Sequence, residues 1–180
     1  MFEPMKWLTL FGCFLACGCG TNTQGPPLPG EEPVHQPLIL RSIEGAAPQV
    51  MTIYSLDANY RPSDEEAVAK ITAESEFFHD WPVIGKKSIT ESSERQSLWN
   101  SLYKGIEDAK GVAASCFWPR HGLRVERNAV QTDYVICFHC LQIEIYTGDK
   151  KEYAQTSDSV QPDFNQVLEA AGIPIAPGGE

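Results

Sequence analysis

Apolar residues recur along the chain at two different spacings. The longer spacing, of three to four residues, predicts helices. Residues 91–109 carry a large apolar residue at nearly every fourth position, a spacing that places these side chains on one face of a helix. Gly111 is expected to end this helix, because glycine readily adopts the left-handed conformation found after many helices. The predicted inward residues are Leu98, Trp99, Leu102, Tyr103, Ile106 and Ala109.

Two further helices are predicted from their start signals. Ser63 followed by Glu66 forms a capping box, which indicates a short helix from Asp64. Pro162 occupies a favoured first helical position and begins the last helix, which Gly172 ends. The expected inward residues are Ala67, Val68 and Ile71 in the first of these helices, and Phe164, Val167, Leu168 and Ala171 in the second.

Short runs rich in β-branched and aromatic residues predict strands. Asn128 and Ala129 are expected at the turn of a hairpin. One later run alternates strictly, with Leu141, Ile143 and Ile145 predicted to point inward. The aromatic patch at residues 77–81 is expected to fill a core. The predicted strands are residues 38–43, 49–56, 83–89, 112–117, 123–127, 130–138, 141–146 and 152–156.

These elements predict an α+β fold. We expect one twisted, mainly antiparallel sheet of about five to six strands with two to three helices packed on one face. A single domain should span residues 38–175, and residues 176–180 should form a frayed tail. Residues 135–138 are apolar on both faces, so this strand should be covered on both sides or interrupted by a bulge near His139.

The N-terminus has the pattern of an export signal. Residues 7–16 form an uncharged, mostly apolar run that is too short to span a bilayer. The segment Phe14-Leu15-Ala16-Cys17 resembles the lipobox of bacterial lipoproteins, in which the cysteine is lipidated and becomes the new N-terminus. The resemblance implies a signal peptide over residues 1–16 and a lipid on Cys17, with Cys19 as the alternative.

Residues 17–37 are predicted to be a proline- and glycine-rich linker that spaces the domain from the membrane. The expected location is therefore outside the cytoplasm, facing the periplasm or the cell exterior, with the lipid holding the protein to the membrane. The chain has 24 acidic and 14 basic residues and a net charge of −10. That balance argues against nucleic acid and anionic membrane surfaces as electrostatic partners.

The cysteines after the linker allow three interpretations. In an oxidising compartment, Cys116 could form a disulfide with Cys137 or Cys140. The C-x-x-C at Cys137 and Cys140 could instead be a redox dithiol, but residues three apart on a strand point to opposite faces, so these sulfurs could pair only across a turn. The third interpretation is a zinc site of Cys116, His121, Cys137 and Cys140, in which His139 could replace Cys140.

A cysteine-dependent hydrolase is a further alternative. It would need Cys116 or Cys137 within hydrogen-bond reach of His121 or His79, and the histidine would be oriented by Asp80 or Asp133. Nothing in the spacing of these residues selects this arrangement.

The strings C-F-W-P-R-H-G and D-Y-V-I-C-F-H-C resemble segments of uncharacterised exported bacterial proteins, a resemblance that implies no activity. The sequence therefore favours a tethered extracytoplasmic lipoprotein that acts as a structural or interaction module with an unknown protein partner. No catalytic residue and no cofactor are assigned. The alternatives are a thiol- or metal-handling protein, with zinc as the metal, and then a hydrolase.

Overall fold

The computed structural model describes residues 36–60, 65–69, 71, 74–111, 114 and 116–177. The predicted signal peptide, both candidate lipid-attachment cysteines and the Ser63 cap lie outside these residues. Within them, no helix has the length and apolar character needed to cross a membrane. The first described helix begins at Gln36, two residues inside the predicted linker.

A seven-stranded sheet forms the body of the protein, and all neighbouring strands are antiparallel. Its spatial order is β2-β3-β1-β4-β5-β6-β7, so the α+β prediction is confirmed with more strands than the expected five to six. The additional strand β2 lies within the aromatic patch. The strands are β1 Val50–Leu56, β2 Phe77–Phe78, β3 Trp81–Ser88, β4 His121–Arg127, β5 Val130–Cys137, β6 Gln142–Thr147 and β7 Lys150–Gln155.

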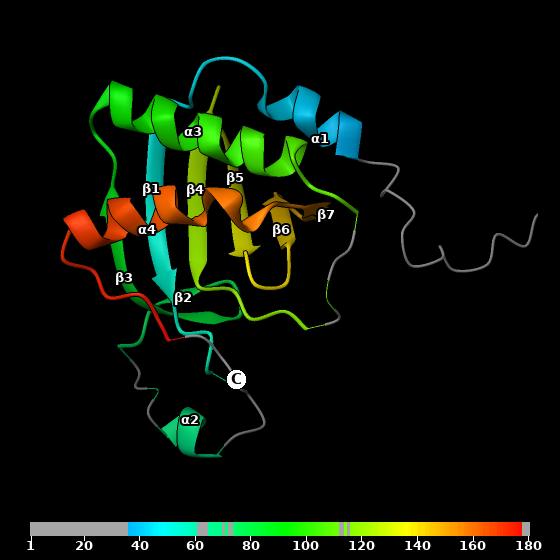
Figure 1. Ribbon diagram of the computed structural model, residues 1–180. Coiled ribbons are helices and arrows are strands. Elements are labelled where there is room, and N and C mark those ends of the chain that lie inside the picture. Colours follow the sequence, from blue (N-terminus) through cyan, green and yellow to red (C-terminus); the bar gives the residue numbers. More distant parts are fainter. Residues whose placement is uncertain are drawn as a thin grey trace, which may run out of the picture.

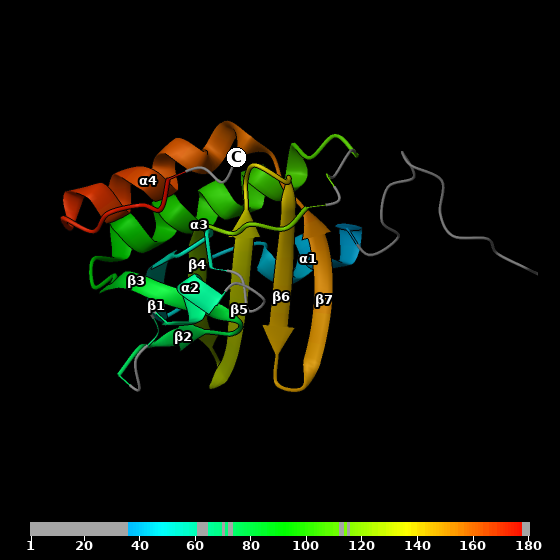
Figure 2. The ribbon, with the colours of Figure 1, turned by 90° about the horizontal axis from the view of Figure 1, so that it is seen from below.

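Three helices cover one face of this sheet, as Figures 1 and 2 show. They are α1 Gln36–Ile43, α3 Ser92–Glu107 and α4 Gln161–Ala170. The short helix α2, Glu65–Ala69, lies apart from them beyond the end of the sheet (Figure 1). A single turn of 3₁₀ helix, Asp158–Val160, leads into α4.

The main core lies between the helices and the sheet. Leu98, Leu102 and Ile106 of α3 are at most 2% exposed, which confirms the predicted inward face of that helix. Their neighbour Trp99 is buried as well, whereas Ala109 lies beyond the end of the helix and is half-buried. The α4 face is confirmed at Phe164 and Leu168, which are fully buried, and not at Ala171, which is exposed.

A smaller core covers the other face of the sheet. It consists of Tyr54, Leu56, Phe78 and Val135, with four half-buried aromatic or aliphatic side chains around it. Phe78 stacks on Tyr54 with ring centroids 4.3 Å apart. It also lies over Gly122, where a β-carbon would come within 2.8 Å of its ring. This second core explains why residues 135–138 are apolar on both faces.

Two predicted strands are wrong. Residues 38–43 belong to helix α1, in which Ile39 and Ile43 are buried four positions apart, a helical rather than an alternating spacing. Of residues 112–117, the described Ala114, Cys116 and Phe117 are not in a strand. An apolar run of about six residues is compatible with either a strand or a helix. For residues 38–43, packing against α3 and the sheet favours the helix.

Three smaller expectations also fail. Val68 of α2 is 43% exposed rather than inward-facing, and Ile71 is half-buried. Leu141 belongs to a turn, with a positive φ of 56°, and not to the alternating strand. Ala176 is 3% exposed instead of frayed, and its carbonyl lies 3.5 Å from Nη1 of Arg120.

Candidate functional site

The two cysteines of the C-x-x-C lie in the turn between β5 and β6. Strand β5 ends at Cys137, and the register pairs Cys137 with Gln142, so residues 138–141 form the connection. This turn brings the two α-carbons to 5.2 Å, within the range of a disulfide, and the two sulfurs are bonded. The sequence allowed this pairing only across a turn, and the structure has a turn there, because the strand ends before Cys140.

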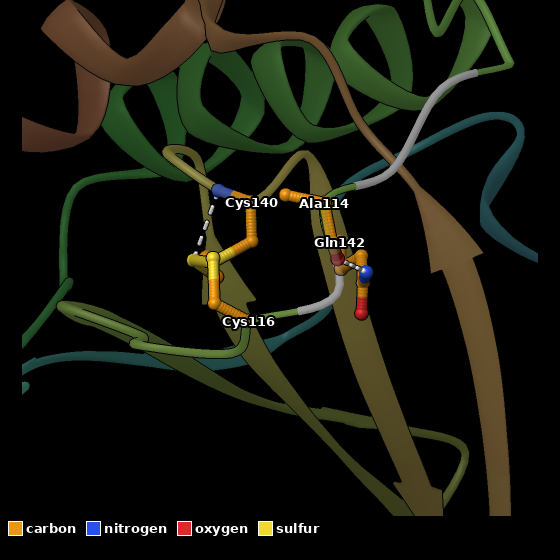
Figure 3. The surroundings of a disulfide bond; sticks show 5 residues. Ala114, Cys116, Cys140 and Gln142 are labelled. Carbon is orange, nitrogen blue, oxygen red and sulfur yellow. Dashed lines mark hydrogen bonds between the residues drawn. A yellow bond between two sulfur atoms is a disulfide. The ribbon is translucent and has the colours of Figure 1, made fainter.

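Cys116 is the free thiol among the described cysteines, although it was the expected disulfide partner. Its sulfur lies 3.5 Å from the sulfur of Cys140, so all three body cysteines still meet at one place (Figure 3). Ala114 is hydrogen bonded to this turn, because its N–H donates to the Cys140 carbonyl at 3.1 Å. The structure thus forms the disulfide between Cys137 and Cys140 and leaves Cys116 in contact with it, rather than bonding Cys116 itself.

His121 belongs to a different environment from the cysteines. It lies on the helix-covered face of β4, is 1% exposed, and its Nε2 is 2.8 Å from Oδ1 of Asn165 on α4. Its ring packs edge-on against Phe138 and Phe164. Burial lowers the pKa of His121 to about 4, which the hydrogen bond to Asn165 only partly offsets. His121 is therefore a neutral core residue at physiological pH.

The structure brings three of the four candidate zinc ligands together, the sulfurs of Cys116, Cys137 and Cys140, and gives the fourth, His121, another polar partner. His121 is hydrogen bonded to Asn165, and the sulfurs of Cys137 and Cys140 are bonded to each other. No group of three or more histidine, cysteine or acidic side chains suited to a metal ion occurs within the described residues.

The hydrolase arrangement is assembled only in part. His79 and Asp133 do meet, with Nε2 of His79 3.0 Å from Oδ2 of Asp133. The candidate nucleophiles are engaged elsewhere: Cys137 is disulfide-bonded, and Cys116 contacts Cys140. The structure thus contains the histidine–aspartate pair, but neither candidate nucleophile is bonded to it.

A connected group of polar side chains lies on the sheet face opposite α1, α3 and α4. The register pairs Arg124 with Asp133, Asp133 with Tyr146, and Tyr146 with Lys151. These four residues form a continuous row across β4, β5, β6 and β7, which we call the Asp133 row. Because paired residues share a face, all four side chains point away from the three helices.

Asp133 is the buried centre of this row. It is 3% exposed, and its carboxylate accepts two hydrogen bonds from Arg124, from Nε at 2.8 Å and from Nη2 at 2.7 Å. The hydrogen bond to Asp133 raises the pKa of Arg124, although partial burial opposes that change. The guanidinium also lies 5.3 Å from the Phe78 ring centroid, so the ion pair is packed against the smaller core.

The other half of the row, Tyr146 and Lys151, packs against aromatic rings. His79 stacks on Tyr146 with ring centroids 3.7 Å apart. It adopts a positive φ of 54°, a conformation that non-glycine residues rarely use. The Tyr146 hydroxyl donates to Glu144 at 2.7 Å, and burial together with this bond raises the pKa of Tyr146 to about 12. Lys151 is 2.8 Å from Glu144 and lies over the rings of Tyr146 and Tyr153, at 5.1 and 5.2 Å.

Sequence reasoning named His79 and Asp133 as candidate partners but did not find the row. Two turn signals could have located most of it. A two-residue turn at Asn128-Ala129 pairs Arg127 with Val130, and therefore Arg124 with Asp133. The turn at residues 148–149 pairs Tyr146 with Lys151 in the same way.

Comparison with known proteins adds no relative to this description. Neither the protein-family models, nor the curated proteins, nor the solved structures include a match to this chain.

Proposed function

We propose that this protein is an exported, lipid-anchored, non-catalytic domain that binds a protein partner through the helix-free face of its sheet. The observation that carries the proposal is the Asp133 row. Its side chains contact one another before any partner arrives, and Lys151 at its outer end lies against Tyr153, which is 57% exposed. A preformed surface loses little side-chain entropy on binding.

The composition of this face supports protein binding. Tyrosine and arginine are the side chains most often found as energetic anchors at protein interfaces. Here Tyr146 and Tyr153 flank Lys151, and Arg124 is held by a buried carboxylate. The polar groups are paired, so a partner could cover them without leaving an isolated buried charge.

The disulfide supports the proposed location. Bonded cysteines persist mainly in secreted and other extracytoplasmic proteins. The bond between Cys137 and Cys140 fits such a compartment, as does the lipobox that places the lipid on Cys17, or alternatively on Cys19.

Site-specific photo-crosslinking tests the binding face. A photoreactive amino acid would replace Tyr153 on β7 in the full chain, and in a matched control it would replace Gln166, an exposed residue of α4 on the helix side. In the bacterium that produces the protein, we expect one discrete crosslinked species from position 153 and none from position 166. Lys151→Glu should abolish the crosslinked species. Crosslinking from position 166 alone, or from neither position, would exclude this face as the binding surface.

A further inference from the structure

Three sulfur atoms meet at the turn between β5 and β6, and they differ sharply in access to solvent. Cys140 is fully buried and Cys137 is 1% exposed, so the disulfide is shielded from reagents in solution. Cys116 is half-buried and carries a free thiol. Any external thiol or disulfide that reaches this cluster in the folded protein therefore encounters Cys116 first.

The chain around Cys116 is held against the turn. Ala114, two residues earlier, donates its N–H to the Cys140 carbonyl at 3.1 Å, and its own carbonyl accepts a hydrogen bond from the side chain of Gln142 (Figure 3). These two hydrogen bonds hold Ala114 against Cys140 in the turn and against Gln142 at the start of β6. The resulting separation of the Cys116 and Cys140 sulfurs, 3.5 Å, is close to van der Waals contact.

We propose that these residues form a thiol–disulfide exchange site. In it, the half-exposed Cys116 exchanges with the buried disulfide, so that thiols in solution can then react with it. In the first step, the Cys116 thiolate attacks the sulfur of Cys140. A Cys116–Cys140 bond forms, the Cys137–Cys140 bond breaks, and Cys137 leaves as a thiolate, which takes up the proton that Cys116 released to solvent. No external oxidant or reductant is required for this isomerisation.

The local structure favours Cys137 as the leaving group. The backbone N–H of Cys140 points at the sulfur of Cys137, with a nitrogen-to-sulfur distance of 3.1 Å. A hydrogen bond to a sulfur stabilises it more as its negative charge develops. Attack at Cys140 thus expels the sulfur that already has a donor.

The second step couples the site to a low-molecular-weight thiol. After isomerisation the disulfide includes the half-exposed Cys116, whose sulfur an external thiolate can attack. This attack forms a mixed disulfide on Cys116 and releases Cys140 as a thiolate. A second external thiol then releases Cys116, so that one protein disulfide is reduced while two external thiols become one disulfide. This chemistry is independent of partner binding at the Asp133 row.

Disulfide mapping of the full-length Cys137→Ser protein tests the first step. Trypsin cleaves after Lys110, Arg120, Arg127 and Lys150, so Cys116 and Cys140 fall on different peptides. After oxidation with glutathione disulfide, we expect a linked pair of peptides 111–120 and 128–150. Cys116 and Cys140 both recovered as unlinked thiols, or as separate glutathione adducts, would overturn the proposal.

The reduction rate tests the second step without removing the native disulfide. Wild type and Cys116→Ser would be treated with reduced glutathione under native conditions, and the thiols of Cys137 and Cys140 trapped by alkylation and counted by mass. Without the Cys116 thiol, the thiols of Cys137 and Cys140 should form about tenfold more slowly or slower still. His139→Ala, at an exposed position within the turn, controls for simple loosening and should react like wild type. Equal rates for wild type and Cys116→Ser would show that the disulfide opens without Cys116.

Discussion

His79 and Asp133 are 54 residues apart in the chain, and their side chains are joined by a hydrogen bond of 3.0 Å. The contact links the β2–β3 turn to the centre of β5 and fastens that turn over the helix-free face of the sheet. Asp133 simultaneously accepts two bonds from Arg124. One buried carboxylate therefore holds two segments of the structure in place.

Asp133→Asn should destabilise the fold. The amide keeps the size of the side chain but removes the charge that faces Arg124 and His79. Breaking a fully buried ion pair can cost about 3–5 kcal/mol. The Arg124 side chain is 40% exposed, so solvent screens the pair. We therefore expect the unfolding free energy to fall by about 2 kcal/mol.

Urea denaturation followed by tryptophan fluorescence measures this loss. The control is Asp80→Asn, at the exposed residue next to His79. A surface substitution of this kind should change the unfolding free energy by less than about 0.5 kcal/mol. Equal stabilities for Asp133→Asn and Asp80→Asn would show that the buried carboxylate does not hold these segments.

His121 should make stability depend on pH. Its folded-state pKa, about 4, lies below the ordinary value of 6.5, so the unfolded chain binds the proton more tightly. The contribution is complete above about pH 6.5 and is lost as the pH falls to about 4, by about 3 kcal/mol in total. His121→Gln keeps a polar partner for Asn165 and should show a shallower loss over this window. Denaturation curves at pH 7 and 4.5 for both proteins measure the difference, and parallel losses would contradict the assignment.

Gly122→Ala should disturb the smaller core. The added β-carbon would lie 2.8 Å from two atoms of the Phe78 ring and 3.2 Å from the β-carbon of Tyr54. Overpacking of this kind costs about 1–3 kcal/mol. Phe78→Leu in the same chain removes the clashing ring, so the double variant should be more stable than the sum of the two single losses implies. Strict additivity in this double-mutant cycle would mean that Phe78 and Gly122 are not coupled.

Reduction of the Cys137–Cys140 disulfide should lower stability only modestly. The two cysteines are three positions apart, so the bond closes a very short loop. For a loop of this size the chain-entropy relation gives a stabilisation of about 2 kcal/mol. Thermal unfolding with and without a reducing agent, using the Cys116→Ser protein so that no third thiol exchanges, measures the change. A loss above about 5 kcal/mol would show that the disulfide holds more of the structure than its own turn.

Much of the fold could be predicted because its signals are local. The four-residue spacing from Leu98 to Ile106 and the two-residue turn at Asn128-Ala129 each specify an element from neighbouring residues, and the structure contains both. Helix α1 was missed because a six-residue apolar run fits a strand equally well, and only its contacts with α3 and the sheet decide between them.

The candidate site was less predictable because its contacts are not local. The β5–β6 connection turns through Leu141 in a left-handed conformation without a glycine to signal it, so the sequence left the pairing of Cys137 with Cys140 as one of several alternatives. The approach of His79 to Asp133 depends on how the β2–β3 hairpin folds across the sheet. The Arg124–Asp133 pairing, in contrast, follows from the predicted turn once its register is extended by three residues.

Metabolic labelling with a clickable fatty acid in a bacterial host tests the proposed lipid anchor and the proposed location outside the cytoplasm. Wild type and Cys19→Ser should incorporate the label and sediment with membranes, whereas Cys17→Ser should do neither. Labelling lost in Cys19→Ser and kept in Cys17→Ser would move the anchor by two residues. Wild-type protein without label, recovered in the cytoplasmic fraction, would show that the protein is neither lipidated nor exported.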